Sequence, residues 1–249
     1  MLKSKTMETL LNRAIYRQRI LLNFCYFLCT LSLFSCKNDA APTTETTTEA
    51  TSQKPEEVQT SSDKTILFFG DSLTAGYGLD DTADAFPGVI QEKIDAAGLD
   101  YQVVNSGISG ETTAGGKSRI DWTLNQKIDV FVLELGANDG LRGVPVSETR
   151  ANLQAIIDAV RASDSETKII LAGMQLPPNM GQQYTSEFKS MFSDLATENN
   201  IFLIPFLLED VGGVPSLNQN DGIHPTVEGH KILADNVWQV LEGVISTPS

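Results

Sequence analysis

Cysteine is scarce in this 249-residue chain, and its three cysteines, Cys25, Cys29 and Cys36, all lie near the N-terminus. Beyond Cys36 the sequence has no thiol, so that part of the chain can form no disulfide, no thiolate metal site and no cysteine nucleophile. Histidine is also scarce, with two residues in the whole chain. We therefore expect no metal ion and no other cofactor to carry the chemistry.

Basic residues are few as well. The chain has 18 Lys and Arg against 32 Asp and Glu. Beyond Cys36 it has 13 basic and 31 acidic residues, a formal charge near −18. Such a charge repels nucleic-acid phosphates and anionic lipid head groups, so binding to DNA or RNA is not expected.

Long apolar runs are missing apart from one near the N-terminus. Residues 1–19 carry five basic side chains and one acid, and the run ILLNFCYFLCTLSLFSC follows from Ile20 to Cys36. A basic start, a short apolar stretch and a small residue before the break are typical of a secretory signal. The apolar part, about 15 residues interrupted by Asn23, is short for a helix that must cross roughly 30 Å of hydrocarbon.

The end of this run, Leu33-Phe34-Ser35-Cys36, resembles the lipobox of bacterial lipoproteins, in which the cysteine is acylated and becomes the new N-terminus. This resemblance implies a signal peptide over residues 1–35 and a lipid anchor at Cys36. It also implies an exported protein attached to a membrane in the periplasm or at the cell surface. An uncleaved membrane anchor is the alternative, and it too holds the protein outside the cytoplasm.

Residues 36–63 offer almost nothing to a hydrophobic core. The stretch PTTETTTEATSQKPEEVQTSS, from Pro42 to Ser62, has no aromatic residue and one large aliphatic residue, Val58. So little apolar surface cannot offset the entropy of ordering the segment. We expect a disordered tether with a reach of roughly 30 Å.

Residues 64–249 are expected to form one domain with a core of its own. Short apolar, β-branched runs predict strands buried on both faces, and apolar residues at helical spacing predict helices between them. The predicted strands are Thr65–Phe69, Gln102–Val104, Val130–Leu135, Lys168–Met174 and Ile201–Ile204. The predicted helices are Ala85–Ala97, Ser147–Ala162, Tyr184–Glu198 and Val227–Val240. This alternation predicts an α/β domain, a three-layer α/β/α sandwich with a five-stranded, mostly parallel sheet.

Polar residues and glycines follow the predicted strands, at the sheet edge where such domains hold their functional groups. The four blocks are Gly70-Asp71-Ser72-Leu73, Asn105-Ser106-Gly107-Ile108-Ser109-Gly110, Gly136-Ala137-Asn138-Asp139-Gly140 and Asp221-Gly222-Ile223-His224-Pro225-Thr226. Taken singly, each block is ordinary turn or helix-capping chemistry. Taken together, the blocks contain what acyl transfer requires.

Ser72 is the candidate nucleophile, and a serine hydroxyl needs a base within hydrogen-bond reach. His230 lies inside a helical pattern and is expected on the polar or rim side, as a surface residue. His224 lies in a loop at the sheet end where Ser72 emerges, which makes it the candidate base. Asp221, three residues earlier, can accept a hydrogen bond from Nδ1 of His224 and stabilise the imidazolium.

The tetrahedral intermediate of acyl transfer also needs donors aimed at its oxyanion, and losing one such donor costs about 10²–10³ in rate. The candidate donors are the backbone N–H of Ser72, the backbone N–H of Gly107 and the side-chain amide of Asn138. Gly107 is a candidate because no side chain blocks its backbone.

These blocks resemble those of the GDSL, or SGNH, hydrolases, named for a serine, glycine, asparagine and histidine in separate segments. In this sequence Ser72, Gly107, Asn138 and His224 match them in order. The blocks GDSLTAGYGL, NSGISGETT, ELGANDGLRG, LPPN and DGIHPT are similar to the thioesterase I / lysophospholipase L1 / arylesterase subgroup over nearly all of residues 65–243. The resemblance implies a flavodoxin-like SGNH hydrolase fold and a serine esterase or thioesterase acting on aryl esters, lysophospholipids or acyl thioesters.

The same resemblance implies roles for further residues. Asp139–Val144, which contains Leu141, corresponds to a mobile loop beside the acyl pocket, and Leu176 and Pro177 correspond to the opposite wall. Asp71 corresponds to a buried hydrogen-bonding residue rather than to the acid of the triad. Ala137 departs from the family pattern, which often has a second glycine before the asparagine.

Other functions stay open. A carbohydrate O-acetyl esterase of the same fold is the alternative, and acyl-chain preference separates the two. A non-catalytic surface binding lipoprotein would have lost Ser72, Asp221 or His224, and none is lost. A nucleotide or flavin binder would carry GxGxxG or GxxxxGK[ST] after the first strand, and neither is present. We expect a small-molecule or lipid ester as substrate, and a monomer.

Overall fold

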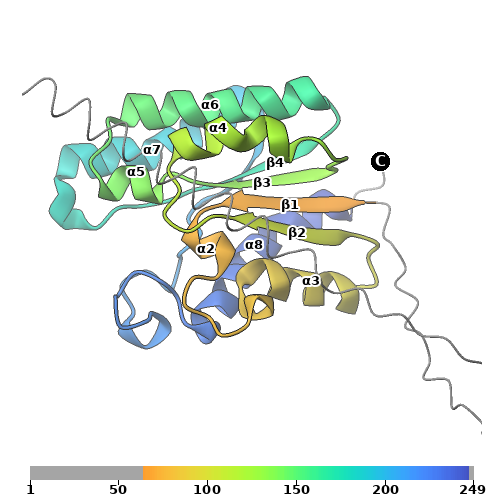
Figure 1. The fold of residues 1–249 in the computed structure, drawn as a ribbon. Helices are drawn as coiled ribbons and strands as arrows, with labels where there is room; N and C mark the ends of the chain where they lie inside the picture. The colour runs from red at the N-terminus through yellow and green to blue at the C-terminus, as the bar shows by residue number, and fades with distance from the viewer. Residues whose placement is uncertain (1–63, 247–249) are drawn as a thin grey trace, which may run out of the picture. The chain divides into compact units, whose positions relative to one another are not determined.

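The structure, a computed structural model, describes residues 64–246 and contains a five-stranded parallel sheet of order β2-β1-β3-β4-β5 (Figure 1). The strands are β1 (Thr65–Gly70), β2 (Gln102–Gly107), β3 (Val130–Glu134), β4 (Lys168–Ala172) and β5 (Phe202–Ile204). All five predicted strands are confirmed. The predicted signal peptide of residues 1–35, the tether of residues 36–63 and the anchor at Cys36 lie outside the described residues.

Helices cover both faces of the sheet, as predicted (Figure 1). One face carries α3 (Phe86–Ala96) and α8 (Val227–Ile245), and the other carries α4 (Thr113–Thr123), α6 (Val146–Ser163) and α7 (Gln182–Asn199). Two short helices, α2 (Ser72–Ala75) and α5 (Ala137–Leu141), and three 3₁₀ turns, η1 (Thr82–Asp84), η2 (Pro178–Met180) and η3 (Pro215–Leu217), complete the elements of residues 64–246. The three-layer α/β/α architecture is thereby confirmed.

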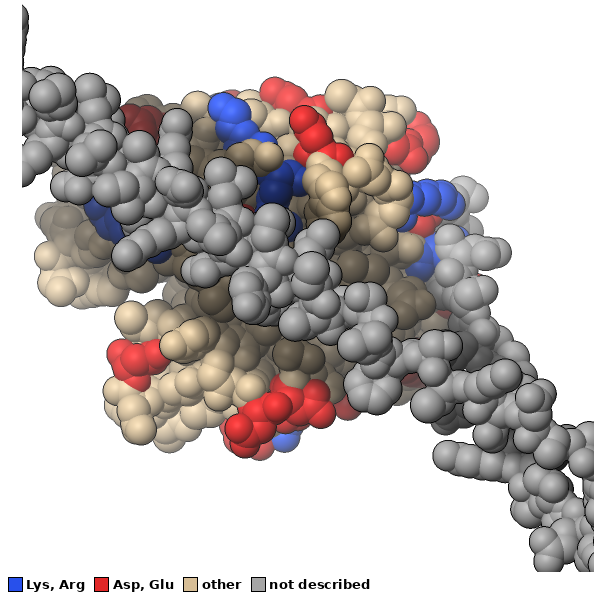
Figure 2. Space-filling model, viewed as in Figure 1, with Lys and Arg blue, Asp and Glu red and all other residues tan. Residues whose placement is uncertain are grey.

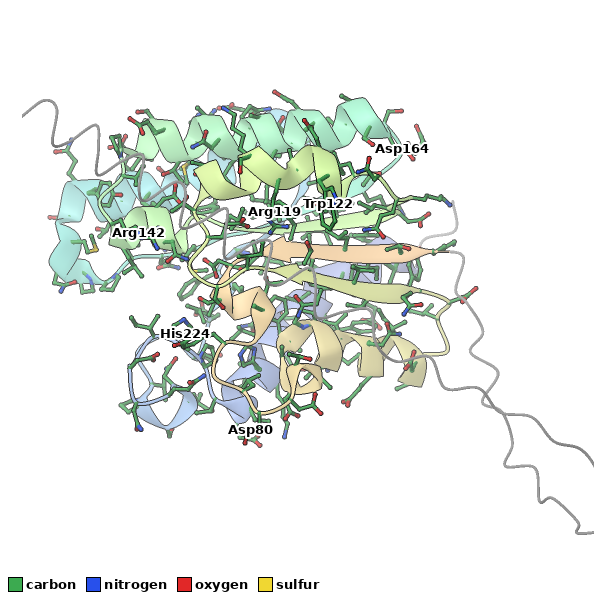
Figure 3. The ribbon with its side chains drawn as sticks, in the orientation of Figure 1. Asp80, Arg119, Trp122, Arg142, Asp164 and His224 are labelled. Atoms are coloured by element: carbon green, nitrogen blue, oxygen red, sulfur yellow. The ribbon has the colours of Figure 1, made fainter. Side chains whose placement is uncertain are left out.

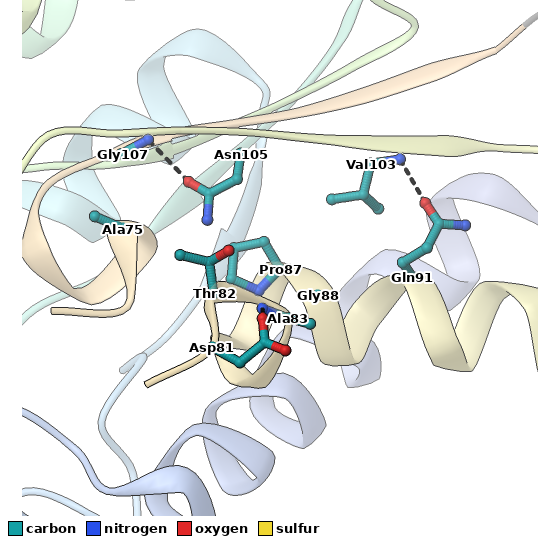
Figure 4. Close-up of a pocket in the computed structure, with 10 residues that line it drawn as sticks. All are labelled: Ala75, Asp81, Thr82, Ala83, Pro87, Gly88, Gln91, Val103, Asn105 and Gly107. Carbon is teal, nitrogen blue, oxygen red and sulfur yellow. Dashed lines mark hydrogen bonds between the residues drawn. The ribbon is translucent and has the colours of Figure 1, made fainter. Parts of the chain in front are cut away.

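The burial of each strand follows from its place in the sheet. Every residue of β3 is buried, and Ile66 to Phe69 of β1 are fully buried, because helices cover both faces of these inner strands. Strand β2 lies at an edge and stays partly exposed. The side chain of Gln91 covers part of this edge, because its Oε1 accepts from the N–H of Val103 at 2.7 Å (Figure 4). Its Nε2 donates to the carbonyl of Tyr101 at 3.1 Å. A covered edge resists pairing with another chain.

Helix α4 is an element that the apolar pattern does not predict. Its sequence, TAGGKSRIDWT, has no continuous apolar stripe, yet Thr112 caps it by accepting the N–H of Gly115. A Cβ at Gly116 would lie 2.4 Å from Cδ1 of Leu135, so the helix backbone packs closely on the sheet side. Close approach through glycine takes the place of large apolar side chains, which is why periodicity gives little sign of this helix.

His230 was expected on the surface, and this prediction is wrong. The side chain lies on α8 facing α3 and is 1% exposed. Its Nδ1 accepts the N–H of Phe86 at 3.2 Å, and the two rings stack with centroids 6.3 Å apart. His230 continues the buried stripe of Leu233, Ala234 and Val237, so helical spacing carries it into the core. Burial lowers the pKa of His230 to about 4, and the ring is neutral at pH 7.

Residues 64–246 contain 25 acidic and 11 basic residues. On the face shown in Figure 2 a group of acidic side chains lies at the lower edge, over the segment that joins α2 to α3, where Asp80, Asp81 and Asp84 occur. The excess of acids makes the long-range field of this domain unfavourable to anionic partners. Within residues 64–246 no helix is both long enough and apolar enough to span a membrane.

Candidate active site

Ser72 stands in a tight turn at the carboxyl end of β1. The strand ends at Gly70, and Asp71 caps α2 by accepting the N–H of Leu73 at its Oδ1, at 3.1 Å. A Cβ at Gly70 would lie 2.1 Å from Oγ1 of Thr74 and 2.4 Å from Oε2 of a glutamate on β3, so glycine is required there. The turn places Ser72 as the first residue of α2, at the edge of the sheet where the sequence predicts the site.

Ser72, His224 and Asp221 form a connected chain of hydrogen bonds. Oγ of Ser72 lies 2.9 Å from Nε2 of His224, and Nδ1 of His224 lies 2.7 Å from Oδ2 of Asp221. Oδ1 of Asp221 accepts the backbone N–H groups of Ile223 and His224, at 2.9 and 3.0 Å, which fixes the loop around the carboxylate. The hydrogen bond from His224 lowers the pKa of Asp221 to about 2, so its carboxylate is ionised at neutral pH. The fold thus brings together the three residues that the sequence singled out.

Tyr77 lies against the imidazole and was not predicted. Its ring centroid is 4.5 Å from that of His224, with the planes tilted by 43°, and its side chain remains half exposed. The ring therefore covers one side of His224 and restricts its orientation. The GDSLTAGYGL block contained the signal, since Tyr77 follows the nucleophile by five residues.

The side-chain amide of Asn138 is held from both ends. Its Nδ2 donates to Oδ2 of Asp71 at 3.0 Å, and its Oδ1 accepts from Nη2 of Arg142 at 3.4 Å. A carboxylate can only accept and a guanidinium can only donate, so the amide cannot flip. One N–H of Nδ2 is left for a ligand. Ala137, just before it, has no positive φ, so the α5 start needs no second glycine.

Two buried carboxyl groups lie beneath the nucleophile turn. Asp71 is 1% exposed and Glu134 is 0% exposed. Oε2 of Glu134 accepts from the N–H of Asp71 at 3.1 Å and from the hydroxyl of Thr74 at 2.7 Å. Burial raises the pKa of Asp71 to about 6, and burial together with the neighbouring Asp71 raises the pKa of Glu134 well above its usual range. Asp71 is buried and hydrogen-bonded, as the resemblance implied. Glu134 was not singled out, although a lone acid in the apolar strand VFVLE is a visible signal.

The backbone N–H of Gly107, which the sequence suggested as an oxyanion donor, is already hydrogen-bonded within the fold. Gly107 pairs with Gly70 at the end of β2, and its N–H donates to Oδ1 of Asn105 at 3.0 Å (Figure 4). A Cβ at this position would lie 2.3 Å from the backbone nitrogen of Ala75. The missing side chain therefore serves the contact between β2 and α2, and the N–H is already engaged.

Gly110, the second glycine of NSGISG, differs from Gly107 in that its backbone N–H is not engaged within the described part of the chain. It lies in the turn beyond β2 with φ +79°, and its carbonyl accepts from Nη2 of Arg142 at 3.0 Å. Within residues 64–246 we find no acceptor for the backbone N–H of Gly110 or for that of Ser72. These two donors and the amide of Asn138 are the available ones around the site. Sequence spacing alone does not distinguish the two glycines, because that requires knowing where β2 ends.

The loops around the site are tied to the helices of one face. Arg119 lies on α4 (Figure 3). Its guanidinium donates to both carboxylate oxygens of Glu111, at 2.6–3.0 Å, and to the hydroxyl and carbonyl of Ser106, at 2.9 and 2.8 Å. Asp139 is buried and accepts from the N–H and hydroxyl of Thr113, at 2.8 and 2.6 Å. The β2–α4 loop and α5 are thereby anchored to α4.

Apolar side chains border the site. Leu141 is 43% exposed on α5, and Leu176 packs on the same helix, since a Cβ at Gly140 would lie 2.5 Å from its Cδ2. Pro177 is exposed next to it. Ile108 and Ile223 are also half exposed, in the loops that carry Gly110 and His224, and sequence reasoning missed both. Leu141 and Leu176, which the resemblance assigns to opposite walls of an acyl pocket, therefore both lie at α5. Mobility of Asp139–Val144 stays a prediction.

The described residues contain no group of three or more His, Cys, Asp or Glu side chains suited to a metal ion. The chemistry available is that of a hydroxyl with a base, an ionised carboxylate behind the base, and three hydrogen-bond donors for an oxyanion. In Figure 3 His224 and Arg142 lie at the same end of the sheet, one on either side of the strand ends. This constellation suits nucleophilic acyl transfer.

Comparison with known proteins shows which proteins this chain is similar to. Residues 68–232 match the GDSL-like Lipase/Acylhydrolase family. The chain is 40% identical over 183 residues to Esterase TesA of Pseudomonas aeruginosa, covering 73% of this chain and 90% of that protein. It is 36% identical over 186 residues to Thioesterase 1/protease 1/lysophospholipase L1 of Escherichia coli, covering 74% and 86%.

A solved esterase structure is also similar to this chain in its fold. The crystal structure of the psychrotrophic esterase EstA from Pseudoalteromonas sp., inhibited by monoethylphosphonate, superposes with a TM-score of 0.69 at 34% identity. The likeness covers 74% of this chain and 100% of the esterase chain. The shared part corresponds in extent to the domain described above.

Proposed function

We propose, from the premise that this chain belongs to the GDSL-like lipase/acylhydrolase family, that it is a carboxylic ester hydrolase working through an acyl-enzyme on Ser72. The observation that carries this proposal is the 2.9 Å approach of Oγ of Ser72 to Nε2 of His224. Esters and thioesters share this route, because both present an electrophilic carbonyl and a leaving group that takes a proton.

In the acylation half-reaction, His224 takes the proton of Ser72 while Oγ attacks the carbonyl carbon. The carbonyl π electrons move onto oxygen, and the backbone N–H groups of Ser72 and Gly110 and Nδ2 of Asn138 stabilise that oxyanion. The tetrahedral intermediate then collapses. His224 gives its proton to the departing alkoxide or thiolate, and the acyl group stays on Ser72.

In the deacylation half-reaction, water takes the place of the leaving group. His224 removes a proton from the water, whose oxygen attacks the acyl carbonyl. The second intermediate then collapses, the bond between the acyl carbon and Oγ breaks, and His224 returns the proton to Oγ, which releases the acid and restores the Ser72 hydroxyl. The carboxylate of Asp221 stabilises the imidazolium at both stages, and its lowered pKa supports this role because the group stays ionised.

The border of the site supports an ester with an apolar acyl chain. Large apolar or aromatic side chains remain 43–51% exposed around the site: Tyr77, Ile108 and Ile223 on its loops and Leu141 on α5. We propose that the acyl chain lies along Leu141, Leu176 and Pro177. Such contacts gain roughly 0.8 kcal/mol per buried methylene, so longer chains should bind more tightly until the contact surface ends.

The cellular location of the protein is a separate proposal, and it rests on the sequence. We propose that the protein is exported as a lipoprotein anchored through Cys36, and that the domain acts as a monomer. Cys36→Ser should move the protein from the membrane fraction to the soluble fraction of the cells that produce it. Equal membrane association of the variant would reject the anchor, and size-exclusion chromatography of the soluble variant tests the monomer.

The test of the function is a chain-length series of nitrophenyl esters from acetate to palmitate, with lysophospholipid, acyl-CoA and acetylated xylan beside it. Ser72→Ala is the control, and it should abolish hydrolysis while leaving the circular dichroism spectrum unchanged. We expect activity to rise beyond acetate. Activity confined to acetate and acetylated xylan would favour the carbohydrate O-acetyl esterase instead, and an active Ser72→Ala variant would refute the acyl-enzyme.

A further inference from the structure

Gln219 links the loop of the base to the loop of the nucleophile. Its Nε2 donates to the carbonyl of Tyr77 at 2.7 Å and to the carbonyl of Pro225 at 2.9 Å. Tyr77 precedes Gln219 by 142 residues, whereas Pro225 directly follows His224. One primary amide thus uses both of its hydrogens to hold two separate segments of chain together.

The backbone of Gln219 also organises the loop that carries the base and its acid. Its N–H donates to the carbonyl of His224 at 2.7 Å, and its carbonyl accepts the N–H of Gly222 at 2.9 Å. Asn218 and Pro225 form an antiparallel bridge beside it. The segment that contains Asp221 and His224 is therefore folded around Gln219.

Tyr77 belongs to the nucleophile side of the site. Its N–H donates to the carbonyl of Ser72 at 3.0 Å, directly after α2, and its ring lies 4.5 Å from that of His224. Gly78, which follows, has φ +78°, and a Cβ there would lie 2.2 Å from Oε1 of Gln219. The absence of a side chain at Gly78 makes room for the amide, so both loops are shaped for this contact.

We propose that Gln219 is a positioning residue that holds the His224 loop against the Ser72 loop and so sets the distance between Oγ and Nε2. The inference rests on the proposed function, since it assigns Gln219 a part in that reaction. Two carbonyl acceptors require a side chain with two donors. A methionine of similar length offers none, and would leave the loops without this link.

The experiment compares Gln219→Met with a matched control, Asn218→Leu. Nδ2 of Asn218 donates to the carbonyls of Val211 and Val214, at 2.7 and 2.8 Å, so the control also removes two hydrogen bonds to backbone carbonyls. Both of its acceptors lie in its own loop, however, and neither belongs to the nucleophile side. The full chain of each variant is melted by circular dichroism, and kcat and KM for a nitrophenyl ester are measured where both are folded.

We expect Gln219→Met to lower kcat by roughly 10- to 100-fold, because misplacing a reacting group by about 1 Å has an effect of this order. KM should stay within about twofold, since the lost contact orients catalytic groups rather than substrate. Asn218→Leu should lower the melting temperature while keeping most of kcat. A kcat of Gln219→Met within about twofold of wild type, or an equal fractional loss in Asn218→Leu, would overturn the proposal. Ser72→Ala in the same assay distinguishes this outcome from failure of the proposed function, because only the latter leaves that variant active.

Discussion

Asn138 donates its side-chain N–H to Asp71 across 3.0 Å, and this bond joins the turn of the proposed nucleophile, Ser72, to the helix that carries a proposed oxyanion donor. Asp71 uses its other carboxylate oxygen to cap α2 through Leu73. Both oxygens therefore accept, and they act on two sides of the same site. The distance between the nucleophile and the oxyanion donor is set by one buried carboxyl group.

Replacing that carboxyl group by an amide should misalign the oxyanion donor. In Asp71→Asn one of the two positions becomes an NH₂ group, which cannot accept from Leu73 or from Asn138. We expect kcat to fall by an amount smaller than the roughly 10²–10³ expected for Asn138→Leu, which removes the donor outright. KM should change little in both variants. Steady-state kinetics on one nitrophenyl ester checks this, and wild-type kcat in Asp71→Asn would contradict it.

The two glycines of NSGISG should respond differently to the same substitution. Gly107→Ala places a Cβ 2.3 Å from the Ala75 backbone, so we expect lost stability and poor folding. At Gly110 the nearest atom to a Cβ is 3.9 Å away, and the fold should survive. The positive φ of +79° costs an alanine on the order of 1–2 kcal/mol and shifts the N–H that we assign to the oxyanion.

Thermal melting and kcat, measured on both variants, separate these effects. Gly110→Ala should lose kcat with only a modest fall in melting temperature, of the order of several degrees. Gly107→Ala should show the larger fall in melting temperature. If Gly107→Ala instead lost kcat while it stayed stable, and Gly110→Ala kept its kcat, the oxyanion donor would be Gly107.

These residues show how much of the candidate site can be predicted from the sequence. Ser72, Asp221 and His224 were predictable because strand ends in a parallel sheet converge on one edge, and few residues of suitable chemistry occur there. The choice between Gly107 and Gly110 was not predictable, because it depends on whether the glycine lies in the strand or beyond it. A shift of three residues changes which N–H is free.

Packing explains the other differences between the predicted and the observed structure. Residues 113–123 form α4 through glycine contacts, which have no apolar signature. His230 and Glu134 are polar side chains in the core, and composition alone assigns such residues to the surface. The sequence pattern around each gives a sign of burial, but the partner of each side chain is known only from the fold: the N–H of Phe86 for the histidine, and the turn at Asp71 for the glutamate.

The burial of His230 predicts a loss of stability in acid. The pKa of this histidine falls from 6.5 to about 4 on folding, so the unfolded chain binds the proton first as the pH is lowered. The stabilisation is therefore present above pH 6.5 and is lost between pH 6.5 and about 4, by up to about 3 kcal/mol. Protonation at Nδ1 would also break the bond from the N–H of Phe86.

The measurement is urea unfolding of wild type and His230→Leu across pH 4 to 7. The variant loses the acceptor for Phe86 at every pH, which lowers its stability by a constant amount. The difference between the two proteins should narrow as the pH falls. A difference that does not change with pH would show that His230 does not titrate in this way.

Glu134 predicts the opposite dependence on pH, and its amide variant is the test. Burial raises the pKa of this acid well above its usual value of 4.5, so its contribution to stability is complete below that pH and is lost as the pH rises through the folded pKa. Gln has the same shape and no charge: its oxygen can accept from the N–H of Asp71 and the hydroxyl of Thr74, as Oε2 does. The amide nitrogen then occupies the place of Oε1, which has no partner within residues 64–246.

We therefore expect Glu134→Gln to fold and to retain most of its kcat at pH 7. In urea unfolding at rising pH above 4.5, it should lose less stability than wild type, because its side chain does not titrate. Glu134→Asp, which keeps the acid but shortens its reach, should lose both stability and activity. An unfolded Glu134→Gln variant beside a stable Glu134→Asp variant would show that the site requires an ionised carboxylate.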